Sequence, residues 1–219
     1  MLKNIKVERR LEKTMQIRDY LFDKKLHIHT VGIQPVSEAT AYYHRYEASP
    51  YVALEQLFTH YRLKKTDRLI DFGCGKGRLN IYTYDRFKND GVGIEMNEKY
   101  YQQAIHNLLS YSKKDENILN RITFMHSLAE TYEMTEKDNY FYFFNPFSVE
   151  IFRKVINNLL YSLEQHMREV KIILYYPDDE YVHYLEQLDI FQLEMEILLP
   201  ENKKDPYEKF LVYSLKSKM

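Results

Sequence analysis

Cysteine and long apolar runs are both scarce in this chain of 219 residues. The single cysteine, Cys74, rules out an internal disulfide, as is usual for proteins of a reducing compartment. No apolar run approaches the roughly 18 residues that cross a membrane, and the start of the sequence lacks the apolar core of a signal peptide. These absences predict a cytoplasmic protein without membrane contact.

Positive charge is not in excess either. The chain has 31 Lys and Arg residues against 32 Asp and Glu, for a formal net charge of −1. The chain therefore lacks the overall excess of positive charge that is typical of proteins that bind nucleic acid mainly through its phosphates. Lysine pairs do occur, and solvated surface is the simplest interpretation of each. They are Lys24-Lys25, Lys64-Lys65, Lys113-Lys114 and Lys203-Lys204. With one cysteine and no histidine spacing typical of a metal site, no bound metal is expected.

Glycine is also rare, yet its distribution is informative. Five of the six glycines share one short stretch. They are Gly73, Gly75, Gly77, Gly91 and Gly93. Glycine permits backbone angles and close approaches that a Cβ forbids. The sequence of residues 68–72 predicts a buried strand before the first three of these glycines, and that of residues 79–82 predicts a helix after them. Residues 91–95 then predict a second strand, which ends in an acid, Glu95. This order is the layout of a nucleotide-binding crossover unit.

The spacing of the glycines distinguishes between nucleotides. The dinucleotide fingerprint G-x-G-x-x-G would need a glycine at position 78, which is Arg78. A phosphate-binding P-loop would need Ser or Thr after Gly75-Lys76, where this chain has Gly77. The observed run is G-x-G-x-G, with Asp71 two residues before its first glycine. The structural alternative is a glycine-rich turn in an ordinary α/β protein.

This run resembles the first motif of the class I S-adenosylmethionine-dependent methyltransferases, and Glu95 matches that family's ribose-binding acid. The resemblance implies S-adenosyl-L-methionine as cofactor and S-adenosyl-L-homocysteine as product. The glycine loop would lie against the amino-acid tail and ribose, and the following helix would offer N–H groups to the tail carboxylate. Glu95 would accept two hydrogen bonds from the ribose diol. Asp71 would pair with the loop backbone or, through water, with the cofactor amine.

The resemblance extends the cofactor site to neighbouring loops. Cys74 is best interpreted as a small residue that fits the loop, not as a nucleophile. Many family members carry an acid after the third strand to hold the adenine amine, but this chain has Leu128 there. Adenine contact would then fall to the backbone of Leu128 and Ala129, or to Glu130, while His126 is as well explained by a surface or core position as by catalysis. The predicted cofactor-binding residues are Asp71, Gly73, Cys74, Gly75, Gly77, Glu95, Met96, Leu128, Ala129, Asn145, Arg45 and Tyr46.

A loop after the fourth expected strand is the candidate acceptor site. In open α/β sheets the ligand lies at the carboxyl ends of the strands, so Asn145-Pro146-Phe147 is expected near the transferred methyl group. The loop resembles the Asn/Asp-Pro-Pro-Tyr/Phe motif of methyltransferases that act on amino nitrogens of bases or of glutamine. There the Asn side chain and a Pro carbonyl accept hydrogen bonds from the NH₂ group and the aromatic ring packs on it, which orients the nitrogen. These three residues are therefore the predicted catalytic residues. Because the chain has one proline where the motif has two, the alternative is a turn with Phe147 in the core.

The sequence after residue 66 alternates between strand-like and helix-like stretches, which indicates a parallel sheet with helices on both faces. Strands are expected at residues 68–72, 91–95, 121–125, 140–144, 170–176, 191–199 and 207–215. No helix separates the last two, so they form a hairpin in which one strand is antiparallel, as in the methyltransferase family. The predicted fold class is α/β: a doubly wound, mostly parallel seven-stranded sheet with an antiparallel C-terminal hairpin, plus an N-terminal helical extension.

Residues 1–62 lack any strand–glycine signal, and we expect them to form a helical cap on a methyltransferase domain of residues 63–219. Apolar residues at helical spacing give this extension one apolar side, which is also a candidate contact with a second copy. They are Val7, Leu11, Met15 and Phe22. Ser49-Pro50 predicts a helix start with Ser49 as N-cap. Just before it, Arg45 or Tyr46 is expected to touch the cofactor tail or the substrate, and a polar connector is the alternative.

The function that follows is methyl transfer from S-adenosylmethionine to a nitrogen, on a protein or nucleic acid in preference to a metabolite. Transfer from a sulfonium to an amine needs little acid–base help, so no general base is assigned. Two alternatives stay open: a methyltransferase of a small metabolite, and a regulatory protein that binds the cofactor without transferring its methyl group. A nicotinamide oxidoreductase is disfavoured by Arg78.

Overall fold

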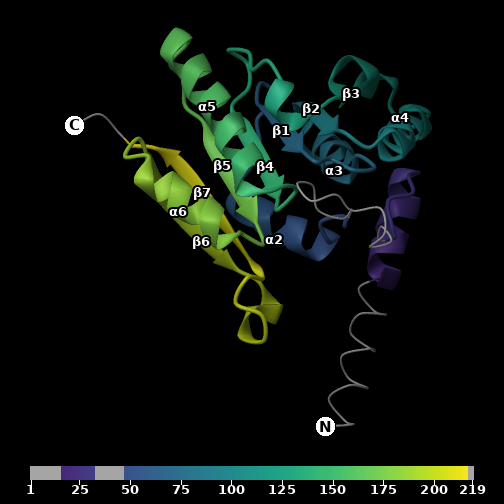
Figure 1. Cartoon of the computed structure of the whole chain (residues 1–219). Coiled ribbons are helices and arrows are strands. Elements are labelled where there is room, and N and C mark those ends of the chain that lie inside the picture. The colour runs from purple at the N-terminus through teal and green to yellow at the C-terminus, as the bar shows by residue number, and fades with distance from the viewer. Residues whose placement is uncertain (1–15, 33–46, 217–219) are drawn as a thin grey trace.

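The computed structural model describes residues 16–32 and 47–216. Seven strands form one sheet in the order β3-β2-β1-β4-β5-β7-β6 (Figure 1). The strands are β1 Arg68–Phe72, β2 Asp90–Glu95, β3 Ile122–His126, β4 Tyr140–Phe144, β5 Lys171–Tyr175, β6 Phe191–Leu198 and β7 Lys209–Leu215. Neighbours from β3 to β5 are parallel, and β7 is antiparallel to both β5 and β6. The predicted mostly parallel sheet with a reversed strand in a C-terminal hairpin is confirmed.

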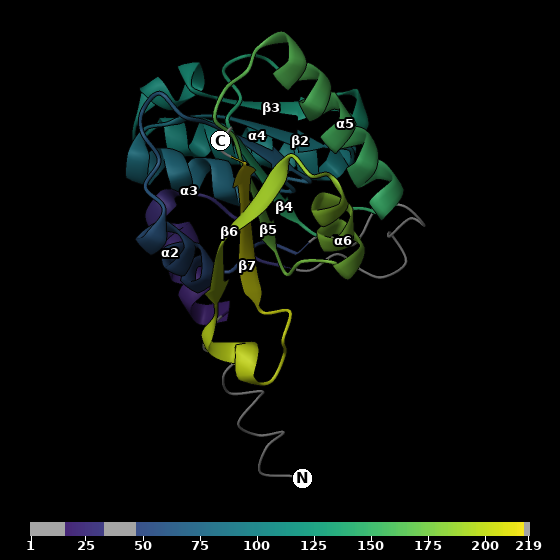
Figure 2. The same ribbon diagram turned by 90° about the vertical axis from the view of Figure 1, so that its left-hand side faces the viewer.

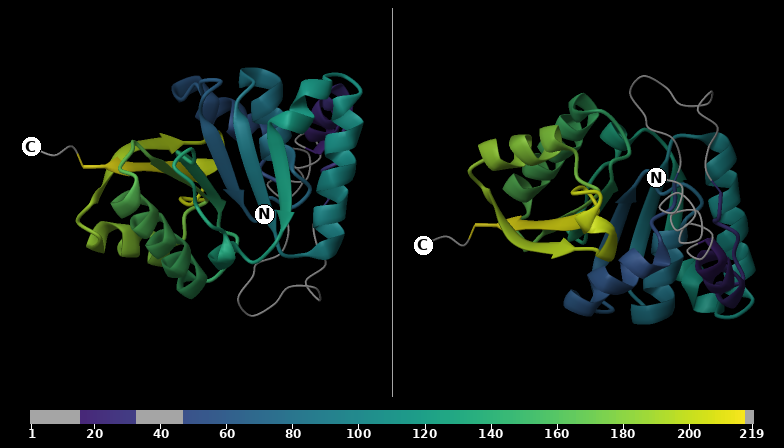
Figure 3. Two further views of the ribbon diagram at one scale, coloured as in Figure 1. Left: turned by 90° about the horizontal axis from the view of Figure 1, so that it is seen from above. Right: turned by 90° about the horizontal axis from the view of Figure 1, so that it is seen from below.

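Helices cover both faces of the sheet, as Figures 2 and 3 show. The α-helices with defined ends are α2 Tyr51–His60, α3 Arg78–Phe87, α4 Glu98–Ser112, α5 Val149–Gln165 and α6 Asp179–Gln187, and the short 3-10 turns are Glu116–Asn120, Ala129–Thr131 and Pro200–Lys203. Residues 16–26 are also helical. One core lies under α2, α3 and α4, and a second lies under α5 and α6. The doubly wound arrangement is thus confirmed.

The burial of each strand explains its sequence pattern. In β1, β4 and β5 three or more of the five residues are buried, because helices cover both faces. In β6 buried and exposed residues mix, because this strand lies at the edge of the sheet. The alternation of apolar and polar residues in the β6 sequence thus accompanies an edge position, and continuous apolar runs mark the central strands.

The N-terminal part shares the first core with the sheet. Leu26 and the α2 residues Leu54 and Leu57 belong to the same cluster as Leu69 of β1. The expectation of Ser49 as N-cap was wrong: Pro50 holds that position, and the Ser49 hydroxyl lies 2.7 Å from the Tyr142 hydroxyl of β4. The contact joins the start of α2 to the centre of the sheet. Val7, Leu11 and Met15 lie outside the described residues.

Candidate functional site

Two loops meet at the carboxyl ends of β1 and β4. The two strands are parallel neighbours, with Phe72 paired to Phe143, so the loops that follow them leave the sheet side by side. A Cβ at Gly73 would lie 2.6 Å from the Cβ of Pro146, well inside any normal contact distance. Gly73 also has a φ of 78°, which L side chains rarely adopt. Glycine at this position therefore lets the glycine loop lie directly on the loop of Asn145.

Glu95 ends β2 and faces the glycine loop. Its Oε2 accepts a hydrogen bond from the Gly75 N–H at 2.9 Å, and its Oε1 accepts one from the Asn97 N–H at 2.7 Å. The side chain is only 8% exposed, and this burial raises its pKa although the two N–H donors oppose the rise. The contacts fix the carboxylate at the loop, in the place expected of a ribose-binding acid.

A second acid, Asp71, lies buried in β1 one residue before the strand ends. Burial, with the charge of Glu95 adding to it, raises the pKa of Asp71 to about 8. Ionising two neighbouring buried acids together costs free energy, because their charges repel and are poorly solvated, unless a positive charge lies nearby. The pair therefore suits a ligand that carries a cation.

The glycines around the loop also make room for the protein's own side chains. A Cβ at Gly77 would lie 2.3 Å from the ring of Phe124 on β3, and one at Gly93 would lie 2.7 Å from the Sγ of Cys74. Cys74 is buried, and this burial raises the pKa of its thiol, which keeps it protonated and unreactive. The spacing of the glycines did not reveal these packing roles, because they depend on side chains of β3 and of the loop itself.

The ends of β2 and β3 lie next to each other. A ring nitrogen of His126 lies 2.9 Å from the Met96 carbonyl oxygen, and the His126 ring stacks on Tyr101 with centroids 5.4 Å apart. Leu128 follows with 44% of its surface exposed, whereas Ala129 is buried. Met96 and Leu128 therefore flank the strand ends where the adenine is expected.

The acceptor loop differs in part from the expectation. Asn145 is half-buried, with an unusual φ of 38°. The ring of Phe147, by contrast, is 1% exposed and packs in the core against Phe143, while its carbonyl accepts a hydrogen bond from the Tyr181 hydroxyl. The expectation that this ring packs on an acceptor is therefore corrected. Pro146 remains at the site, in contact with Gly73.

Sequence reasoning missed a set of buried polar residues on the outside of the glycine loop. In the sequence Arg78 stands out only as a residue that is not the third glycine of a dinucleotide fingerprint, yet it is buried and hydrogen-bonded to Thr30 and to the Ser49 carbonyl. Asn107 of α4 is likewise buried and donates to the Lys76 carbonyl. No local pattern marks these residues, because their partners lie far away in the sequence. Arg45 and Tyr46 lie outside the described residues.

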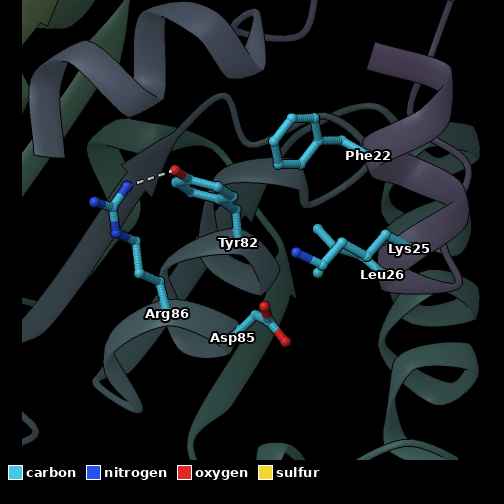
Figure 4. Close-up of a pocket in the computed structure, with 6 residues that line it drawn as sticks. All are labelled: Phe22, Lys25, Leu26, Tyr82, Asp85 and Arg86. Atoms are coloured by element: carbon cyan, nitrogen blue, oxygen red, sulfur yellow. Dashed lines mark hydrogen bonds between the residues drawn. The ribbon is translucent and has the colours of Figure 1, made fainter. Parts of the chain in front are cut away.

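A small pocket lies away from the strand ends, between helix 16–26 and α3 (Figure 4). It is lined by Phe22, Lys25, Leu26, Tyr82, Asp85 and Arg86. The α3 residues in it are roughly one to two turns beyond the glycine loop, so the pocket is separate from the candidate site. Within residues 16–32 and 47–216, no cluster of three or more potential metal ligands occurs, and no helix has the length and hydropathy of a membrane span.

Comparisons with known proteins agree on the fold. No family model and no curated protein matches the sequence. An RNA methyltransferase from Salinibacter ruber, solved with S-adenosyl-L-homocysteine, is 15% identical with a TM-score of 0.57, over 80% of this chain and 96% of the other. A SAM-dependent methyltransferase from Thiobacillus denitrificans, also solved with S-adenosyl-L-homocysteine, is 13% identical with a TM-score of 0.53, over 78% and 92%.

A third similar structure acts on a different class of acceptor by name. It is precorrin-6y C5,15-methyltransferase from Geobacter metallireducens, 15% identical with a TM-score of 0.55, over 78% of this chain and 90% of the other. At these identities the similarity establishes the fold. The chain has the Rossmann-like fold of the class I S-adenosylmethionine-dependent methyltransferases.

Proposed function

We propose that this protein is a methyltransferase that uses S-adenosyl-L-methionine. One observation carries the proposal: Glu95, at the end of β2, receives the Gly75 N–H of a glycine loop that begins at the end of β1. The acid and the loop thus share one site at the carboxyl edge of the sheet, where open α/β folds bind their ligands. The fold agrees with this assignment.

Each residue has a role that its surroundings support. Glu95 binds the ribose diol, and the N–H groups at the start of α3 meet the tail carboxylate. Asp71 balances the positive charge of the cofactor's amine, directly or through water. Met96 and Leu128 pack against the adenine. The cofactor supplies an electrophilic methyl group on its sulfonium.

Asn145 is the residue that we assign to the acceptor. It follows β4 next to the glycine loop, and its side chain carries an amide oxygen, a group that accepts hydrogen bonds from amines. Holding that nitrogen in line with the methyl group is catalysis by positioning. Pro146 keeps the loop against Gly73, and its carbonyl is a second acceptor for the amine.

For the acceptor, we propose a nitrogen on a protein or nucleic acid. The support is the Asn-Pro loop, and the similar structures named for RNA and for precorrin show how widely acceptors vary within this fold. A metabolite methyltransferase is the second candidate. A regulatory protein without transfer activity is the third, and the polar Asn145 beside the loop argues against it.

Calorimetric titration with S-adenosylmethionine, S-adenosylhomocysteine and NADH tests the cofactor. The first two should bind and NADH should not; heat from NADH alone would overturn the assignment. Glu95→Ala should weaken binding by about 1–3 kcal/mol, the cost of leaving buried polar groups without a partner.

Labelled methyl groups identify the acceptor. The protein is incubated with labelled cofactor and a lysate from cells that lack its gene, and the products are separated into protein, RNA and small molecules. Label in protein or RNA supports the proposal. Label confined to small molecules favours the metabolite alternative, and no transfer at all, with the cofactor bound, favours the regulatory one.

A further inference from the structure

A segment from the N-terminal part lies along the outside of the glycine loop. The Lys76 ammonium donates to the Val31 carbonyl at 3.0 Å. The side-chain amide of Asn107 in α4 joins the two segments. Its nitrogen donates to the Lys76 carbonyl at 2.9 Å and to the His29 carbonyl at 3.2 Å, and its oxygen accepts from the His29 N–H at 2.9 Å. Residues 29–31 are therefore attached to the loop through both side chain and backbone.

Arg78, the first residue of α3, extends this attachment. Its side chain is only 4% exposed. Its Nε donates to the Thr30 hydroxyl at 2.6 Å, one terminal nitrogen donates to the Ser49 carbonyl at 3.0 Å, and the same nitrogen pairs with Asp19. The guanidinium carbon also lies 4.5 Å from the centroid of the Tyr51 ring. One buried cation thus connects helix 16–26, residue 30 and the start of α2 to the end of the glycine loop.

Asp23 completes the network from the other side. Its carboxylate accepts from the Thr30 hydroxyl at 2.7 Å, from the Val31 N–H at 3.1 Å and from the Tyr51 hydroxyl at 2.8 Å. A second terminal nitrogen of Arg78 lies 3.9 Å from it. Two carboxylates, from Asp19 and Asp23, therefore face the buried arginine. A fully partnered buried network is rigid, and removal of one member leaves the others uncompensated.

The conformation of the loop explains why it needs outside support. Its three glycines have φ values of 78°, 54° and 81°, and glycine loses more conformational freedom on folding than any other residue. The inner side of the loop has to stay accessible to a ligand. Besides the Glu95 carboxylate, contacts that hold the loop in shape come from residues 29–31 and Arg78.

We propose that residues 29–31 are a working part of the cofactor site, and that Arg78 and Thr30 are positioning residues that hold the glycine loop in its ligand-binding conformation. The inference rests on the proposed function. In this role the N-terminal segment does more than cover the cofactor site. It supports the glycine loop, and without that support the protein binds its ligand more weakly.

The test compares two substitutions at one buried position in the full chain. Thr30→Val keeps the shape but removes the hydroxyl that joins Arg78 to Asp23, and Thr30→Ser keeps the hydroxyl. We expect Thr30→Val to weaken S-adenosylhomocysteine binding about tenfold, the equivalent of one buried hydrogen bond, and Thr30→Ser to bind within about twofold of the unmodified protein. Binding is measured by calorimetry, and thermal unfolding without ligand is measured in parallel.

Two controls separate positioning from stability. Tyr111→Phe removes a buried hydroxyl that donates to Asp85, in the same core but at the far end of α3. Arg18→Ala removes an exposed ion pair between helix 16–26 and Glu55 of α2. Both should leave the dissociation constant unchanged, even where Tyr111→Phe lowers the melting temperature as much as Thr30→Val does.

The outcomes are distinct. Equal affinity in folded Thr30→Val and in the unmodified protein would overturn the inference, and so would an equal loss in Tyr111→Phe. If Thr30→Val does not fold, Arg78→Lys replaces it: a lysine keeps the charge for Asp19 but cannot reach Thr30 and Ser49 together, and the same tenfold loss is expected. Absence of binding by the unmodified protein would instead remove the proposed function itself.

Discussion

Asn145 and Tyr176 follow neighbouring parallel strands, and both have a left-handed backbone, with φ of 38° and 49°. The pairing of Phe144 with Tyr175 brings them side by side at the edge that carries the glycine loop. A bulky residue in this conformation is a genuine outlier, and such strain of about 1–3 kcal/mol tends to collect at functional sites. The Tyr176 hydroxyl donates to Asp205 at 2.7 Å, which joins the residue after β5 to the turn between β6 and β7.

Substitution of Asn145 should separate stability from turnover. Asn145→Gly should be at least as stable as the unmodified protein, because glycine adopts a positive φ without strain, while Asn145→Ala should lose about 1 kcal/mol. Both variants should bind S-adenosylhomocysteine normally and lose most methyl transfer. Urea unfolding, calorimetry and a transfer assay check the three quantities. A parallel loss of cofactor affinity would mean that Asn145 shapes the cofactor pocket instead.

The contact between Gly73 and Pro146 predicts a coupled pair. Gly73→Ala places a Cβ 2.6 Å from the Cβ of Pro146, so we expect a loss of about 1–3 kcal/mol in the free energy of unfolding, with weaker cofactor binding. Pro146→Gly removes the obstructing atoms, so the double variant should recover part of the stability lost by Gly73→Ala. A double-mutant cycle from urea unfolding gives the coupling. Simple additivity would show that the two loops are not in contact.

The pKa of Asp71 predicts how stability depends on pH. Burial raises this pKa to about 8, whereas an aspartate in an unfolded chain ionises at about pH 4. Between these values the folded protein holds a proton that the unfolded chain has released, so stability falls as pH rises. Asp71→Asn should reduce this fall by on the order of 1–3 kcal/mol between pH 5 and pH 8. The same slope in both proteins, measured by urea unfolding, would contradict the prediction.

The exposed side chain of Leu128 predicts an effect on affinity alone. With 44% of its surface already accessible, Leu128→Ala should leave the melting temperature nearly unchanged. Loss of the apolar contact that we propose between Leu128 and the adenine should weaken S-adenosylhomocysteine binding by about 1 kcal/mol. Adenosine, which lacks the amino-acid tail, should show a loss of similar size. If the loss appears only with the full cofactor, Leu128 lies at the tail and not at the adenine.

The sheet could be predicted from the sequence because its signals are local. Buried central strands need continuous apolar runs, and the edge strand β6 shows its exposure as alternation. The glycine loop was also visible, because Gly73 and its neighbours have backbone angles that few other residues adopt. The reversed strand followed from the lack of an α-helix between β6 and β7, which are joined only by a short segment with a 3-10 turn.

What could not be predicted depends on contacts between distant residues. Asn107 meets His29 across 78 positions, and Arg78 meets Thr30 across 48, so neither contact leaves a periodic pattern. The role of Phe147 was misjudged for the same reason, since its burial depends on packing against Phe143 and against Tyr181 of α6. The resemblance of the loop to a methyltransferase motif suggested an exposed Phe147 ring, but packing against α6 buries it.

The position of β7 has a consequence for synthesis of the protein. This strand is the last of the described chain, yet it lies between β5 and β6 and pairs with both. Until β7 emerges from the ribosome, β5 carries an open hydrogen-bonding edge and β6 has no neighbour. Open edges of this kind pair readily with other chains. The nascent protein is therefore most exposed to aggregation just before β7 is made, after every residue of the candidate site has already been synthesised.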